Sequence, residues 1–261
     1  MVLEGKTVIV SGVGPGLGGE IATRVLRDGA NLVIGARNAK KLEGIARELD
    51  PDGERVLAHP FDITEPDACA GIVAATEDRF GGLDAMVQVA ALDAVFGGSE
   101  ATSPEDWRRV MEVNVIGSVE LTKACVPAME RRGGGAIVLI GSQSYALPPD
   151  TPQIAYASSK GALLSASIQL AHELGPRKIR VNTVIPTWMW GPPVEGYVKW
   201  QAKERGVSEA EVKAGIEAKF PLGEIPADDD VAEVVVLFCS DRMRMVTGQY
   251  LRVDAGEKMT L

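Results

Sequence analysis

The sequence predicts an α/β fold in which a doubly wound, seven-stranded parallel sheet carries helices on both faces. Seven short apolar runs rich in β-branched residues recur along the 261 residues. They are continuous rather than alternating, which is typical of strands buried on both faces. Helical stretches separate them in regular alternation. Because no Pro- or Ser-rich linker interrupts the pattern, we expect one domain over residues 1–261.

The apolar runs predict strands at residues 7–10, 31–34, 55–58, 85–89, 136–140, 179–185 and 250–253. The intervening stretches predict helices at residues 18–28, 39–49, 67–80, 105–131, 154–174 and 230–240. The last helix follows three aspartates, which suit a helix start. Residues 187–226 break the alternation with three tryptophans and a charged helical pattern. We expect this insertion to form a substrate-binding lid.

Composition and charge argue against several classes of protein. The formal net charge is -9 and no Lys/Arg-rich run is present, so we expect no binding to nucleic acid. No apolar stretch reaches the roughly 18 residues that a membrane span needs. Three scattered cysteines and two histidines predict neither a disulfide framework nor a metal centre. The first residues lead straight into a strand, which predicts a cytoplasmic protein with reduced thiols.

A glycine-rich loop follows the first strand and opens the first helix. Its segment SGVGPGLGG sets Gly12, Gly16 and Gly18 in a G-x-x-x-G-x-G spacing. Glycine lets the chain turn tightly and brings backbone N–H groups against a ligand, and a helix start favours a pyrophosphate. We therefore predict a dinucleotide site that also includes Leu17 and Pro15, whose ring stiffens the loop. A plain tight turn is the alternative.

The ends of the second and third strands bear on the choice of dinucleotide. Ala36 and Arg37 stand where an NAD site places a carboxylate for the ribose 2′-hydroxyl. A guanidinium suits a 2′-phosphate instead, so we predict that NADP is preferred and NAD is possible; a solvated surface arginine is the alternative. Asp62, followed by Ile63, either accepts a hydrogen bond from the adenine amino group or caps the helix that begins near Pro66.

Four polar residues form the candidate catalytic set. Tyr156 and Lys160 share one face of the predicted helix 154–174, and the ammonium favours ionisation of the phenol for proton exchange with a substrate oxygen. Lys160 would also bond the nicotinamide ribose. Ser142, after the fifth strand, could hold the same substrate oxygen. Asn114 is a poor helix former, and a kink there could hold a water that passes a proton toward Lys160. The alternatives are that the Tyr156–Lys160 spacing arises by chance, that Ser142 is a turn residue and that Asn114 marks a helix irregularity.

The chain resembles the short-chain dehydrogenase/reductase family over essentially its whole length. The matching segments are SGVGPGLG at 11–18, DIT at 62–64, Asn114, Ser142, YASSK at 156–160, IRVN at 179–182, VTGQ at 246–249 and VDAG at 253–256. The resemblance implies a Rossmann fold, a nicotinamide cofactor and a catalytic set of Asn114, Ser142, Tyr156 and Lys160. It also implies a homotetramer with the long helices and the last strand as interfaces.

Three positions depart from the family pattern. The segment QVAA, which contains Ala90, replaces the usual Asn-Asn-Ala-Gly after the fourth strand. Pro186 is followed by threonine rather than the usual glycine. Gly191 stands where a threonine often bonds the nicotinamide carboxamide. We still expect Ala90 and Pro186 in the cofactor site, and we expect the backbone of Met189 to hold the nicotinamide.

These residues predict an NAD(P)-dependent oxidoreductase that interconverts a secondary alcohol and a ketone, with Tyr156 as acid and base. Trp188, Trp190 and Tyr197 indicate an apolar or cyclic small-molecule substrate, unless they only pack the lid. A non-catalytic dinucleotide-binding regulator is one alternative. An epimerase or dehydratase is another, since such enzymes share the Tyr-x-x-x-Lys pair and the cofactor. Those usually carry a larger C-terminal substrate domain, whereas residues 246–256 already complete the expected sheet.

Overall fold

All strands of the computed structural model, which describes residues 1–259, pair in parallel in the order β3-β2-β1-β4-β5-β6-β7. The strands are β1 (Thr7–Ser11), β2 (Asn31–Ala36), β3 (Val56–Pro60), β4 (Ala85–Gln88), β5 (Gly135–Ile140), β6 (Ile179–Pro186) and β7 (Tyr250–Val253). Every predicted strand is confirmed. The order reverses at β1, where Ser11 is in register with Gly35 on one side and Gln88 on the other. In a doubly wound sheet the ligand crevice lies at the carboxyl ends of the strands beside this reversal.

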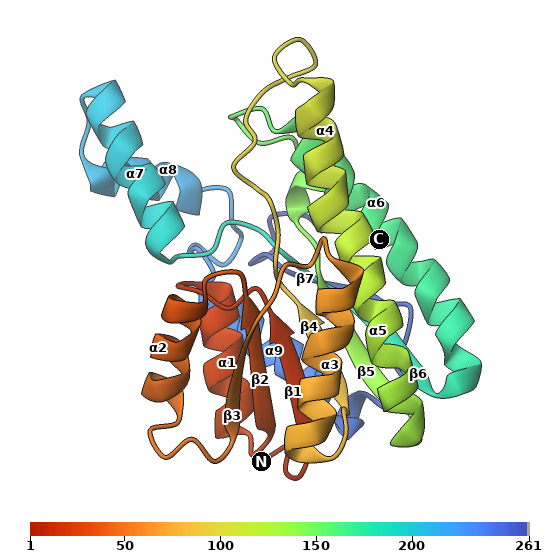
Figure 1. Cartoon of the computed structure of the whole chain (residues 1–261). Coiled ribbons are helices and arrows are strands. Elements are labelled where there is room, and N and C mark those ends of the chain that lie inside the picture. The colour runs from red at the N-terminus through yellow and green to blue at the C-terminus, as the bar shows by residue number, and fades with distance from the viewer. Residues whose placement is uncertain (260–261) are drawn as a thin grey trace.

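Helices cover both faces of the sheet (Figure 1). They are α1 (Leu17–Arg27), α2 (Ala39–Leu49), α3 (Pro66–Phe80), α4 (Pro104–Met111), α5 (Gly117–Arg131), α6 (Ile154–Leu174), α7 (Pro192–Arg205), α8 (Glu209–Glu217) and α9 (Asp228–Cys239). On β1, Val8 and Val10 belong to the core beneath α1, α2 and α9. Ile9 points the other way, into the core beneath α3, α5 and α6. The alternation confirms the predicted Rossmann-like fold with two covered faces.

The expected helix at 105–131 is interrupted. Helices α4 and α5 are joined by a π-helical turn at Glu112–Ile116, and Asn114 is at its centre. A π turn inserts one extra residue into the helical ladder, so the irregularity that Asn114 indicates is present. Helix α7 was not expected from the sequence. It begins with two prolines, which fit the first helical turn because the N–H groups there have no intrahelical acceptor.

Helices α7 and α8 stand away from the rest of the molecule at the carboxyl edge of the sheet (Figure 1). They enclose a small core of their own: Val198, Ala202, Val212, Ile216, Phe220 and Ile225. Trp188, Trp190 and Tyr197 are partly buried and pack against this core, and the Trp188 and Tyr197 ring centroids are 4.9 Å apart. These aromatic side chains therefore pack within the insertion, and whether they also contact a substrate stays a prediction.

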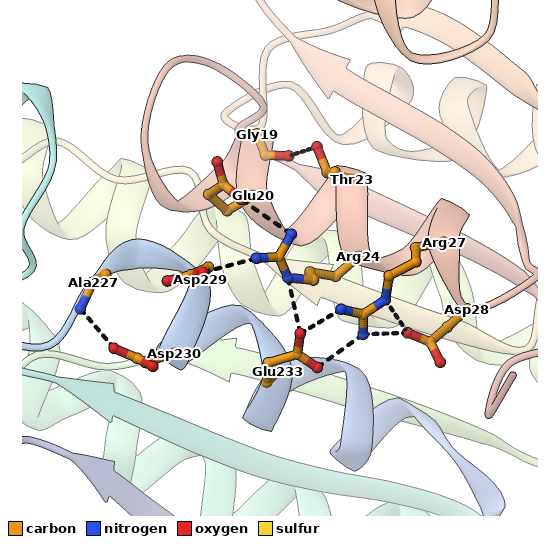
Figure 2. Close-up of polar contacts among 10 residues, drawn as sticks. All are labelled: Gly19, Glu20, Thr23, Arg24, Arg27, Asp28, Ala227, Asp229, Asp230 and Glu233. Atoms are coloured by element: carbon orange, nitrogen blue, oxygen red, sulfur yellow. Dashed lines mark hydrogen bonds and ion pairs between the residues drawn. The ribbon is translucent and has the colours of Figure 1, made fainter.

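Ion pairs join α1 to α9 across their exposed faces (Figure 2). Arg24 lies 2.9 Å from the carboxylates of both Asp229 and Glu233. Arg27 contacts Glu233 and the neighbouring Asp28. Each such exposed pair contributes about 0–1 kcal/mol. These ion pairs mainly hold the two helices in place. Helices α1 and α9 lie side by side, and both begin at the carboxyl edge of the sheet.

Three further sequence expectations concern membranes, thiols and metals. Within residues 1–259, no helix has the length and apolar character to cross a bilayer. Cys69, Cys125 and Cys239 are buried and free. Burial raises the pKa of the Cys239 thiol to about 12, so this side chain behaves as a small apolar group rather than a nucleophile. Over the described part of the chain, no group of three or more His, Cys, Asp and Glu side chains has a metal-binding arrangement.

Candidate active site

The glycine loop between β1 and α1 forms a cradle that side chains would fill. Gly12 and Gly16 have φ angles of 90° and 94°, in the left-handed region that favours glycine. A Cβ added to Gly12 would lie 2.3 Å from the backbone nitrogen of Ala90. A Cβ added to Gly18 would lie 2.3 Å from the carbonyl oxygen of Gly12. The loop therefore presents bare backbone beside the first turn of α1, whose N–H groups have no intrahelical acceptor.

The segment that departs from the family pattern still fixes this loop. The backbone N–H groups of Val89 and Ala90 donate to the carbonyl oxygen of Ser11 at 2.9 and 3.0 Å. The buried Gln88 amide donates to the Ala90 carbonyl and to the Ser118 hydroxyl, each at 3.0 Å. These bonds hold the turn after β4 against the end of β1, and the role of Ala90 in cofactor binding stays a prediction.

A cavity of about 960 Å³ opens beside the loop. Six predicted cofactor residues line it: Gly12, Pro15, Arg37, Asp62, Ile63 and Ala90. The remaining predicted residues lie outside this lining. Gly16 is the N-cap of α1, and Leu17 and Gly18 are its first two residues. Pro186 is the last residue of β6, and Met189 lies three residues further along the chain.

Four charged residues in the lining were not expected from the sequence: Asp93 from the segment after β4, Arg108 and Arg109 from α4, and Glu112 from the π turn. Arg108 pairs with Glu105 at 3.3 Å and Arg109 with Asp106 at 3.4 Å, one turn back on the same helix. In the sequence they look like the solvated face of an amphipathic helix. Only the packing of α4 against the crevice distinguishes them.

Asp62 and Arg37 are neighbours in this cavity. One carboxylate oxygen of Asp62 accepts from the backbone N–H and the hydroxyl of Thr64, at 3.0 and 2.8 Å. The backbone bond from Thr64 is the main cause that lowers the pKa of Asp62, and the Arg37 charge adds to it. The residue preceding α3 is Glu65, and no side chain caps this helix. The prediction that Asp62 caps it is therefore wrong, because its carboxylate closes a local turn instead.

Tyr156, Lys160 and Ser142 meet at the carboxyl end of β5. Tyr156 lies in the first turn of α6, Lys160 in the second, and Ser142 directly follows β5. The Lys160 ammonium donates to the backbone carbonyl of Ile140 at 2.7 Å. The Ser142 hydroxyl lies 2.9 Å from that of Ser144. The structure thus brings three of the four predicted catalytic residues together.

Asn114 also contacts helix α6, through a hydrogen bond to Ser159. Its side-chain oxygen accepts from the backbone N–H of Leu92 at 2.7 Å, and its amide donates to the Ser159 hydroxyl at 2.9 Å. Ser159 in turn donates to the carbonyl oxygen of Tyr156 at 2.7 Å. The Asn114 side chain therefore faces Leu92 and Ser159 rather than Lys160. Its predicted role in a water-mediated proton relay stays a prediction.

Burial dominates the ionisation of the central pair. It raises the pKa of Tyr156 to about 12, against the hydrogen bond from Ser142, and the Asp93 charge adds to the rise. Burial lowers the pKa of Lys160 to about 8, against the attraction of Asp93. From the sequence, Lys160 is expected to lower the pKa of Tyr156, whereas in this structure the pKa of Tyr156 is raised. The reason is that removal from water penalises the charged form of both groups.

Comparison with known proteins identifies the architecture. A family model described as "Enoyl-(Acyl carrier protein) reductase" matches residues 12–258. The pig protein "Dehydrogenase/reductase SDR family member 4" is 31% identical over 255 residues, covering 97% of this chain and 88% of the pig protein. The chain belongs to the short-chain dehydrogenase/reductase (SDR) family. It is an oxidoreductase of that family.

Two further proteins are similar to this SDR over nearly its whole length. An uncharacterized oxidoreductase of Methylorubrum extorquens is 33% identical over 256 residues, which cover 97% of this chain and 98% of that protein. The crystal structure of L-sorbose reductase from Gluconobacter frateurii, complexed with NADPH and L-sorbose, superimposes with a TM-score of 0.92 at 29% identity. Each chain is covered completely. The SDR fold is therefore preserved over the whole chain.

The family implies a nicotinamide dinucleotide, and the residues of this SDR fit one. Gly12 and Gly18 leave a cradle that a Cβ would close. Arg37 is exposed at the rim of the cavity, and within residues 1–259 no hydrogen bond or ion pair joins it to another side chain. The donor set therefore suits a ligand with a pyrophosphate and a further anionic group.

Proposed function

We propose that this SDR interconverts a secondary alcohol and a ketone with a nicotinamide dinucleotide, and that it prefers NADP to NAD. The observation that carries the proposal is that the buried Lys160 and the partly buried Tyr156 and Ser142 gather at the same sheet edge as the glycine cradle. When bound, the dinucleotide supplies or accepts the hydride. The protein then has to orient the substrate oxygen and move one proton.

Tyr156 is the group that moves the proton. During ketone reduction its phenol donates a proton to the carbonyl oxygen, and during alcohol oxidation the phenolate takes it back. Ser142 donates a hydrogen bond to the same oxygen. The Lys160 ammonium, 5.7 Å from the centre of the Tyr156 ring, stabilises the phenolate that reduction leaves behind. Asn114 positions this group through Ser159 and the Tyr156 backbone.

The cavity supports the preference for NADP. A guanidinium binds a phosphate bidentately. Arg37 forms no hydrogen bond or ion pair with a side chain of residues 1–259, although its charge acts on the neighbouring Asp62. Arg108 and Arg109 line the same cavity. Asp62 uses one carboxylate oxygen for Thr64, and we propose that its other oxygen accepts from the adenine amino group.

The substrate side lies under the lid of residues 187–226. Trp188, Trp190 and Tyr197 pack against the lid core but remain partly exposed. Their remaining ring surface supports an apolar or cyclic small molecule, because aromatic rings offer large rigid contact areas. Pro186 ends β6 and Met189 lies near the start of the lid, where Pro186 and the Met189 backbone would contact the nicotinamide.

The decisive experiment is a panel of alcohols and ketones assayed with NADPH, NADH and their oxidised forms, followed by the absorbance of the reduced nicotinamide. Turnover that is faster with the NADP pair supports the proposal. Dinucleotide binding without turnover on any substrate favours a regulator. Substrate conversion with no net change in the reduced nicotinamide favours an epimerase or dehydratase.

We also propose that the enzyme assembles as a homotetramer. The edge strand β7 exposes Tyr250 and Leu251, and the long helix α6 exposes Ile168. An edge strand with exposed apolar side chains is a surface that proteins usually cover. Light scattering of the purified protein tests the assembly, and a monomeric mass contradicts it.

A further inference from the structure

A buried carboxylate lies against the glycine loop. Asp228, the first residue of α9, is 8% exposed. Its Oδ2 lies 3.4 Å from the position of a Cβ on Gly16 and 2.3 Å from the position of a Cβ on Gly191. Within residues 1–259, the Asp228 carboxylate has no hydrogen-bond or ion-pair partner. Gly191 thus leaves the space that this carboxylate occupies beside the loop.

Two contacts between segments fix Asp228 at this place. Trp190 and Ala227 form a β-bridge, and the Trp190 N–H donates to the carbonyl oxygen of Pro226 at 2.7 Å. The ion pair between Arg24 and Asp229 holds the start of α9 against α1 (Figure 2). The carboxylate is therefore held at the junction of the glycine loop, α9 and the start of α7.

Capping of the helix does not account for Asp228. Asp230 accepts from the backbone N–H of Ala227 at 2.8 Å and so closes the first turn of α9 (Figure 2). Asp229 is used by Arg24. Of the three consecutive aspartates, Asp228 alone has no structural partner in the described part of the chain, and it is the one that faces the loop.

The charges around Asp228 are mostly negative. Glu20 on α1 and Asp229 on its own helix both add to the effect of burial, which raises the pKa of Asp228 to about 6. The nearby cation, Arg24, is shared among Asp229, Glu20 and Glu233. Glu195 is the acidic residue of the first turn of α7, and the loop segment SGVGPGLGG brings no charged side chain.

We propose that Asp228 contacts the dinucleotide as a neutral acid and donates its carboxyl O–H to a pyrophosphate oxygen at the glycine loop. The proposal rests on the proposed function, which places a pyrophosphate at the start of α1 beside Gly16. An ionised Asp228 would repel that pyrophosphate, and no side chain of the loop offsets the repulsion. A neutral carboxyl group can instead donate a hydrogen bond to the pyrophosphate through its O–H, whereas an ionised carboxylate can only accept hydrogen bonds. Binding above the pKa of Asp228 therefore takes up one proton from solvent at this residue.

The consequence is a dinucleotide affinity that falls as pH rises. Where Asp228 is ionised in the free protein and neutral in the complex, the Kd rises about tenfold for each pH unit, because one proton is taken up per dinucleotide. The 2′-phosphate of NADP titrates with a pKa of about 6, so its contribution must be separated. NAD(H), which lacks this phosphate, shares the pyrophosphate and provides that separation.

The test measures the Kd of NADPH and NADH by titration calorimetry from about pH 6 to about pH 9, a range that spans the expected proton uptake. We compare the wild type with Asp228→Asn, Asp228→Ala and the control Glu195→Gln, which removes the acidic charge in the first turn of α7. The asparagine donates at every pH, so its Kd for NADH loses the part of the pH dependence that Asp228 causes, about tenfold per pH unit, and is at least tenfold lower than the wild-type value at the alkaline end. The alanine variant loses the same part of the pH dependence but binds more weakly than the asparagine variant. The control keeps the wild-type slope.

The wild type alone gives a second readout that requires no variant to fold. Calorimetry in two buffers with different ionisation enthalpies reports the number of protons taken up on binding, and we expect close to one at alkaline pH. Binding without proton uptake, or an Asp228→Asn variant with the wild-type slope, overturns the role of Asp228 while leaving the oxidoreductase proposal intact. Absence of binding of either dinucleotide at every pH overturns both.

Discussion

The Nζ of Lys160 donates a hydrogen bond to the backbone carbonyl of Ile140 at 2.7 Å. Ile140 is the last residue of β5, two positions before Ser142. A single bond thus ties the second turn of α6 to the strand that presents the serine. Because Tyr156 lies one turn earlier on α6, the bond also fixes the separation between the phenol and the serine hydroxyl. The candidate proton-transfer residues are therefore positioned in part by a hydrogen bond to the backbone of β5, and not only by contacts between flexible side chains.

Replacement of Tyr156 by phenylalanine tests the proton-transfer role. We expect kcat to fall by about 10²–10⁴-fold, which is the usual contribution of a positioned general acid or base. The Kd for the dinucleotide should stay unchanged because the phenyl ring still fills the buried position. Steady-state kinetics and calorimetric binding measure the two quantities. Tyr250→Phe removes a hydroxyl from the exposed strand β7 and serves as the control, and wild-type turnover in Tyr156→Phe would contradict the assignment.

The burial of Lys160 makes stability depend on pH. Its pKa is lowered to about 8 in the folded protein from its usual value of 10.5. Between these values the unfolded chain binds more protons than the folded one, so folding becomes more favourable as pH rises through this window. In Lys160→Met this gain is absent. We expect the free energy of unfolding of the wild type to rise relative to the variant by up to about 3 kcal/mol, at about 1.4 kcal/mol per pKa unit.

Chemical denaturation at a series of pH values measures this difference. Cysteine and tyrosine ionisation affect both proteins alike, so only the difference between the two curves reports on Lys160. Parallel curves between neutral and alkaline pH would show that the ammonium is not buried in an unfavourable environment. A wild-type free energy of unfolding that falls relative to that of the variant in this range would mean that folding raises the pKa of Lys160 instead of lowering it.

The strands were predictable because each is a continuous apolar run between turn residues. The periodicity of such a run depends only on local sequence, and burial on both faces leaves it with no competing pattern. That Tyr156 and Lys160 lie on one helix was predictable for a similar reason, since they are four residues apart in the sequence. Helix α7 was missed because its prolines and aromatic residues resemble an irregular loop until their place in the first turn is known.

Other features of the site depend on tertiary contacts that no local pattern contains. The sequence shows three successive aspartates at a helix start, but only the bridge between Trp190 and Ala227 turns Asp228 toward the glycine loop. The direction of the Tyr156 pKa was missed for the same reason. Spacing indicates a neighbouring ammonium, whereas the extent of burial, which decides the direction here, is set by the complete fold.

Removal of the Arg37 guanidinium should change the choice of cofactor. We expect Arg37→Ala to raise the KM for NADPH about 10–100-fold, because hydrogen bonds to a charged group contribute about 1.5–3 kcal/mol. The KM for NADH should stay within a factor of about 3, since the adenosine ribose then offers no phosphate. Arg47→Ala is the matched control, because Arg47 is exposed on the neighbouring helix α2. An equal loss with both cofactors would mean that Arg37 does not recognise the 2′-phosphate.

Gly18 and Gly14 provide a matched pair within one loop. A Cβ on Gly18 would lie 2.3 Å from the carbonyl oxygen of Gly12, whereas a Cβ on Gly14 would have no neighbour within 4 Å. Neither residue has a positive φ, so the two alanine substitutions differ in space rather than in backbone strain. We expect Gly18→Ala to destabilise the fold by about 1–3 kcal/mol, the usual cost of overpacking.

The same Gly18 substitution should also weaken dinucleotide binding, because relief of the clash moves Gly12 and the start of α1 apart. Gly14→Ala should leave the free energy of unfolding within about 0.5 kcal/mol of wild type, as for surface substitutions that meet no neighbour. Urea denaturation and calorimetric titration with NADPH measure the two effects. Equal stability of the two variants would show that the loop can move at Gly12. The close contact between the backbones of Gly12 and Gly18 would then not be what holds the glycine loop in shape.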